Sequence, residues 1–109
     1  MSPSHVLRLV GELDLVSVPP LRRQWIALAD EDRPERIVVD LTDVTYIDGS
    51  CLGALLALLK RQRLHGGDLT LRGAGPHIAR VLQLAGLTAT FPDAAAAPDT
   101  DPRAALHHG

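Results

Sequence analysis

The chain has 109 residues, which is enough for one domain with one hydrophobic core. With 46% apolar residues, 22% charged residues and a single cysteine, it has the composition of a globular protein without an internal disulfide. A net charge of −2 gives no electrostatic argument for binding to nucleic acid or to an anionic membrane, and we expect neither partner. Aromatic residues make up only 3%, so we expect a core of aliphatic side chains.

We expect neither a membrane span nor a signal peptide from the sequence. The apolar run 52–59 is too short to cross a bilayer. The N-terminus lacks a basic segment followed by an apolar one, so no signal peptide is expected. Together with the lone thiol, which suits a reducing compartment, these features predict a cytoplasmic protein without membrane insertion.

The first third of the chain predicts a strand, a helix and a second strand. Residues 6–10 are a short apolar strand, which turns at residues 11–14. Ser17 is a candidate N-cap for a helix that the acidic run 30–32 brings to an end, because negative charge is unfavourable at a helix C-terminus. A buried strand rich in β-branched residues is expected over 36–41.

The most informative stretch is the switch from strand to helix at Asp48-Gly49-Ser50. The residues after the switch follow helical spacing on one face, at Leu52, Leu55, Leu56 and Leu59. Asp48 is a good N-cap candidate, because its carboxylate can accept the free amides of the first turn. Ser50 would then lie near the positive end of the helix dipole, where a phosphate group is well accommodated.

The rest of the chain continues the alternation of strands and helices. The central helix is expected to end at Gly66-Gly67, and a strand over 68–72 and a helix from Pro76 to a C-terminal Gly86 follow. Residues 88–91 suggest a final short edge strand. The pattern predicts one α/β domain, residues 1–92, with a mostly parallel sheet of about four strands and about three main helices. Residues 93–109, rich in Ala, Pro and Asp, are expected to be a flexible tail.

Other reactive side chains have simpler interpretations. The five histidines do not follow metal-ligand spacing, and we expect neither a metal nor a cofactor. Cys51 could be a redox sensor, because a helix N-terminus lowers a thiol pKa, but a small side chain filling a tight gap is the commoner case. Asp14 is most simply a solvated turn residue.

Three segments resemble the STAS domain, and most of all the bacterial anti-sigma-factor antagonists. They are residues 11–14 (GELD) after the first strand, residues 40–48 (DLTDVTYID) before the central helix, and Gly66-Gly67 after it. The resemblance runs over about residues 6–91. It implies a STAS-like fold, and a non-enzymatic regulator of transcription that acts by partner switching.

The resemblance also implies a modification site and partners. In that family a serine at the helix start is phosphorylated by an anti-sigma factor with serine-kinase activity. The unphosphorylated form binds this kinase, the phosphorylated form releases it, and a phosphatase resets the switch. By motif position the phosphorylated residue would be Ser50. The residues expected to contact the partner are Asp14, Asp48, Gly49, Cys51 and Leu52.

The motif departs from the family pattern at two positions, which keeps other functions open. Gly49 stands where the family commonly has serine, and Cys51 stands where it has glycine. A non-switching STAS subunit of a transport or lipid-trafficking complex is therefore the main alternative. A serine hydrolase is a weaker one, because the glycines around Ser50 do not match a nucleophile elbow and no Asp/His pair is evident.

Overall fold

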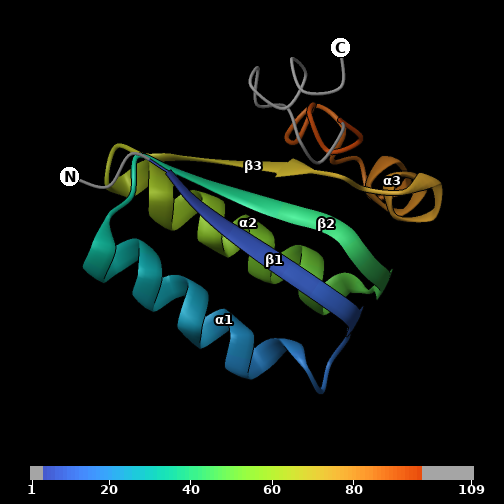
Figure 1. Cartoon of the computed structure of the whole chain (residues 1–109), viewed down its shortest axis with the longest axis horizontal. Coiled ribbons are helices and arrows are strands. Elements are labelled where there is room, and N and C mark those ends of the chain that lie inside the picture. The colour runs from blue at the N-terminus through green and yellow to red at the C-terminus, as the bar shows by residue number, and fades with distance from the viewer. Residues whose placement is uncertain (1–3, 97–109) are drawn as a thin grey trace, which may run out of the picture.

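A three-stranded parallel sheet, with the strand order β1-β2-β3, organises residues 4–96, the part of the chain that the computed structural model describes (Figure 1). The α/β class is confirmed, with three strands in these residues rather than about four. In chain order the elements are β1 (Ser4–Leu13), α1 (Val18–Ala27), a π-helical turn η1 (Leu28–Asp32), β2 (Arg36–Ile47), α2 (Gly49–Leu64), β3 (Asp68–Arg72) and α3 (Pro76–Leu84).

Helices α1 and α2 pack side by side on one face of the sheet (Figure 1). The crossovers β1 to β2 and β2 to β3 join parallel neighbours and advance in the same direction, and crossovers of the usual right hand then place their helices on the same face. The core between the layers is aliphatic, as the composition predicts. Among its fully buried members are Ile37, Val39, Leu41, Leu55, Leu58 and Leu71.

The buried face of α2 is broader than the predicted leucine stripe. Leu55 and Leu59 are buried as expected, whereas Leu52 and Leu56 are only half-buried at its margin. Because α2 contacts both the sheet and α1, a wider arc of the helix is covered. Its buried positions are Cys51, Ala54, Leu55, Leu58, Leu59 and Gln62.

Strand β2 continues six residues past its predicted end, to Ile47. The polar residues among 42–46 do not stop it, because they stay exposed while Val44 is buried and the backbone remains paired with the second half of β1. Two shifts of register occur along this pairing, and Gly11 takes a positive φ of 82° next to one of them. The extension carries β2 to the level of Leu13, so that the two strands end together.

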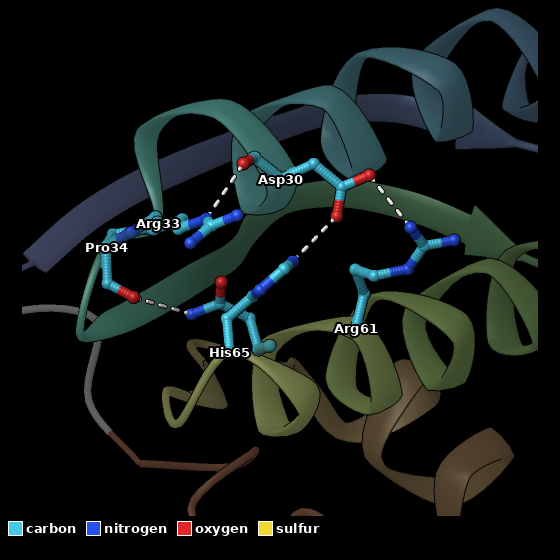
Figure 2. A network of polar contacts seen from close by, with 6 residues as sticks. Asp30, Arg33, Pro34, Arg61 and His65 are labelled. Carbon is cyan, nitrogen blue, oxygen red and sulfur yellow. Dashed lines mark hydrogen bonds and ion pairs between the residues drawn. The ribbon is translucent and has the colours of Figure 1, made fainter.

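The turn η1, which continues α1, is joined to the C-terminal end of α2 by a polar network (Figure 2). The Asp30 carboxylate accepts from Arg61 Nη1 at 2.8 Å and is 2.9 Å from His65 Nε2. Close by, the buried Gln62 side chain donates to the Pro34 carbonyl at 3.0 Å. The acidic run that was expected to end the helix does so through η1, and one of its carboxylates meets the basic end of α2.

The segment after α3 differs from the expectation. Gly86 is the predicted C-terminal glycine, with φ of 75° and the Leu87 amide bonded back to the Leu82 carbonyl. The predicted strand over 88–91 is wrong: these residues form turns, with the Phe91 amide donating to the Leu87 carbonyl and the Phe91 ring buried.

The first residues of the predicted tail contact the domain. The Ala96 carbonyl accepts from the Gly73 amide, and Ala94 is buried. The remainder of the predicted tail, 97–109, lies outside the described residues, so the proposed domain boundary stays a prediction. Within residues 4–96 no helix is both long and apolar enough to cross a membrane.

Candidate functional site

The loops that follow β1 and β2 lie side by side at the carboxyl end of the sheet (Figure 1). Leu13 and Ile47 are register partners, and the Asp48 amide extends the pairing by donating to the Leu13 carbonyl at 3.2 Å. Asp14 and Asp48 therefore start adjacent loops. In open parallel sheets ligands commonly bind at this end of the strands.

Asp48 caps α2 as predicted. Its backbone is extended, and its Oδ1 accepts from the amides of Ser50 at 2.9 Å and Cys51 at 3.4 Å, and from the Ser50 hydroxyl. The hydroxyl bond of Ser50 lowers the pKa of the Asp48 carboxyl most, the two amides lower it further, and partial burial and the charge of Asp14 oppose them. The net effect is a lowered pKa, so Asp48 is a carboxylate at neutral pH.

Ser50 is the second residue of α2 and is partly exposed. Its hydroxyl proton points to the Asp48 carboxylate, which leaves the oxygen lone pairs free to meet an electrophile. A hydroxyl held by a carboxylate is the arrangement in which phosphoryl transfer has an acceptor for the proton it releases. The chemistry of this pair is thus suited to a phosphoacceptor.

The two residues that depart from the family pattern have different surroundings. Gly49 is exposed, and a Cβ added to it would meet no atom within 4 Å, so the helix start has room for a serine there. The Cys51 side chain is completely buried, so it has no surface through which to touch a partner. Burial, aided by the Asp48 charge, raises the pKa of its thiol to about 12, which outweighs the helix dipole and makes a redox role unfavourable.

Asp14 organises the neighbouring loop instead of simply facing solvent. Its Oδ1 accepts from the amides of Val16 and Ser17, each at 3.0 Å, and lies 3.2 Å from the Ser17 hydroxyl, which shares its single proton between this oxygen and the Glu12 carbonyl. The bond from the Ser17 amide is the main cause of a lowered Asp14 pKa. Ser17 occupies the predicted N-cap position of α1, but its hydroxyl donates to the Glu12 carbonyl and caps no helix amide.

Sequence reasoning missed the loop formed by Leu15, Val16 and Ser17. The signal that could have found it is the spacing of Asp14 and Ser17, because an aspartate commonly binds amides two and three residues further on. Of the predicted site residues, the structure brings Asp14, Asp48, Gly49 and Ser50 to one edge. Leu52 is half-buried one turn along α2, and Cys51 is in the core.

Residues 4–96 contain no group of three His, Cys, Asp or Glu side chains placed to hold a metal ion. A cavity of about 320 Å³ lies between β3 and residues 89–93, with none of the residues around Ser50 among its lining. The candidate site itself consists of exposed or half-buried residues at the ends of β1 and β2.

Comparison with known proteins identifies a matching domain family and relatives of this chain. The profile of the family described as "Mlab, STAS domain" matches residues 2–92. The chain is 32% identical to the anti-sigma-B factor antagonist of Bacillus subtilis over 81 residues, covering 74% of this chain and 72% of that protein. It is 30% identical to the anti-sigma F factor antagonist of Paenibacillus polymyxa over 87 residues, or 80% and 74% of the two chains.

Solved structures agree with this assignment. An anti-sigma factor antagonist from Mycobacterium paratuberculosis superposes with a TM-score of 0.76 and 27% identity, over all of this chain and 89% of the other. The phosphorylated form of the Bacillus cell fate determinant SpoIIAA, at 22% identity and a TM-score of 0.69, shares the fold over all of this chain and 94% of its own. The protein belongs to the STAS domain family.

Proposed function

We propose that the protein is an anti-sigma-factor antagonist whose binding to a serine-kinase anti-sigma factor is switched by phosphorylation of Ser50. The observation that carries the proposal is the Ser50 hydroxyl, held by the Asp48 carboxylate at the exposed start of α2. It occurs in a chain that is 32% identical to a protein named as an anti-sigma-B factor antagonist. The protein acts as a binding partner rather than an enzyme, in the cytoplasm, and a phosphatase resets it.

Binding to the kinase uses the edge of the sheet where the two acidic loops meet. Asp14, Asp48 and Gly49 lie there, with Leu52 one turn further along α2. In the unphosphorylated protein this surface carries two carboxylates whose pKa values are lowered, so both are charged at neutral pH. A partner with basic groups at the matching positions is favoured.

Phosphorylation changes this surface strongly without requiring the domain to unfold. The phosphate adds about −1.5 to −2 charges. The amides that would otherwise receive it, those of Ser50 and Cys51, are already bound to the Asp48 carboxylate. The phosphate must therefore displace that carboxylate or project toward the partner. A loss of about 3 kcal/mol of binding free energy would lower affinity more than a hundredfold, which is enough for a switch.

The test is phosphorylation with defined proteins. The protein is incubated with ATP and each purified anti-sigma factor encoded in the same genome, and the modified residue is mapped by peptide mass spectrometry. We expect one phosphate on Ser50, none in Ser50→Ala, and normal modification of Ser4→Ala, which changes an exposed serine on β1. Ser50→Ala should also stay bound to the kinase in the presence of ATP.

The opposite result would favour a subunit that does not switch. In that case Ser50 would remain unmodified with every kinase and in native cells across growth and stress conditions. Wild type and Ser50→Ala would then bind a stable partner equally well, and the proposed switch would be abandoned.

A further inference from the structure

Two adjacent aliphatic side chains project into solvent beside the Ser50 site. Leu15 is 74% exposed and Val16 is 85% exposed, although both lie in the short loop between β1 and α1. Single exposed apolar side chains are common on protein surfaces and need no explanation. A contiguous pair next to a candidate recognition site is less usual, and neither residue belongs to the core.

The loop that carries this pair is held firmly in place. The Asp14 carboxylate accepts the amides of Val16 and Ser17, the Asp14 carbonyl accepts the amide of Val18, and the Asp14 amide donates to the Ser17 hydroxyl. That hydroxyl in turn donates to the Glu12 carbonyl, which belongs to β1. The two apolar side chains are thus presented by a preorganised backbone, which reduces the entropy lost when a partner covers them.

The surroundings of the pair are acidic. Asp14 immediately precedes it, and the loop containing Asp48 lies alongside, close enough for the charge of Asp14 to oppose the lowering of the Asp48 pKa. A complementary surface would have an apolar pocket for the two side chains and basic residues around its rim. This arrangement of an apolar anchor within a charged border is typical of protein interfaces.

We propose that Leu15 and Val16 are the apolar anchor through which the protein docks on its anti-sigma factor, in an apolar pocket bordered by lysine or arginine. This inference rests on the proposed function and deepens it, because it places the main source of affinity outside the phosphorylated helix. Ser50 then acts as a switch at the edge of an interface that the β1–α1 loop holds together. Phosphate added there would lie beside the anchor.

The test compares two pairs of exposed apolar residues. The double variant Leu15→Ala, Val16→Ala is compared with the control Leu64→Ala, Leu84→Ala, in which the replaced side chains are 79% and 72% exposed but lie at the ends of α2 and α3. Affinity for the anti-sigma factor that phosphorylates Ser50 is measured by titration calorimetry without ATP. We expect the loop variant to bind about 10- to 100-fold more weakly, and the control within about twofold of wild type.

Both variants should keep the wild-type circular dichroism spectrum and melting temperature, because the replaced side chains are not part of the core. Raising the salt concentration should weaken binding of the wild type, as a basic rim requires. If the loop variant binds as tightly as wild type, Leu15 and Val16 are not the anchor, while the proposed function stands. If wild type binds none of the anti-sigma factors, the proposed function and the anchor both fail.

Discussion

The Ser50 hydroxyl and the Ser50 amide both donate to the same oxygen of Asp48. One carboxylate therefore caps the helix and orients the side chain at which we place the phosphate. Structure and modification depend on the same residue, so its removal should affect both.

Asp48→Ala is expected to lower the melting temperature by a few degrees, because the first amides of α2 lose their acceptor. It should also slow phosphorylation of Ser50 at least tenfold, since the hydroxyl loses its proton acceptor. Differential scanning calorimetry and a kinase assay measure the two effects. Asp43→Ala, which removes an exposed carboxylate from β2, is the matched control and should change neither.

Acid should destabilise the protein through the loop carboxylates. The pKa values of Asp14 and Asp48 are lowered from 3.8, by the Ser17 amide and the Ser50 hydroxyl respectively. Because the unfolded chain takes up these protons first, their stabilising contribution is complete above about pH 4 to 5 and is lost as the pH falls through the lowered values.

Urea unfolding at pH 7 and at pH 3 should therefore show a smaller free energy of unfolding at pH 3. Asp14→Asn should reduce that difference, because it removes one of the two loop carboxylates with a lowered pKa. If the free energy of unfolding falls equally between pH 7 and pH 3 in Asp14→Asn and in wild type, Asp14 does not contribute to the acid sensitivity.

The Cys51 thiol should be chemically inert in the folded protein. Its side chain is fully buried and its pKa is raised to about 12, so almost no thiolate exists at pH 8. A thiol reagent such as dithionitrobenzoate should react with it only after unfolding in urea. Rapid reaction of the native protein would reopen the redox interpretation.

Gln62 should be the most costly polar residue to remove. Its side-chain nitrogen donates to the carbonyls of Pro34 and Asp68, each at 3.0 Å, and so joins the connection before β2 to the start of β3. Gln62→Ala leaves a cavity and removes both hydrogen bonds, for an expected loss of about 2–4 kcal/mol in the free energy of unfolding. Gln24→Ala, at an exposed position on α1, should cost less than about 0.5 kcal/mol by the same urea measurement.

Gly49→Ala should stabilise the fold by about 0.4–1 kcal/mol, because the backbone does not need glycine and the new methyl group has open space. Gly66→Ala is the informative comparison. Gly66 also has open space, but its φ of 79° strains any other residue, so this change should destabilise the protein in equilibrium unfolding.

The local signals in the sequence predicted local structure well. The Asp48 cap and the C-terminal glycine at Gly86 depend on interactions within a few residues, and both are where the sequence places them. Ile37, Val39 and Leu41 are buried on the central strand, as the β-branched composition of this stretch predicts.

The predictions that were wrong or missing concern features that depend on residues far apart in the sequence. Strand β2 continues to Ile47 because the second half of β1 is available to pair with it, which a stretch of polar residues does not reveal. Residues 88–91 form turns, and the Phe91 ring is buried, although their composition suits a strand. The exposed loop at Leu15 and Val16 was missed because apolar residues are expected to be buried, and only the structure shows how Asp14 holds them out.

The hydrogen bond from the Asp48 amide to the Leu13 carbonyl joins two loops that are far apart along the chain. The surface around Ser50 is thus formed by two segments that are distant in sequence, and it exists only when β1 and β2 have paired. A synthetic peptide spanning Ser50 would contain the serine and its capping aspartate but not the loop of Asp14. Under the proposed function, a nascent chain would become a kinase substrate only after its second strand had left the ribosome and paired with the first.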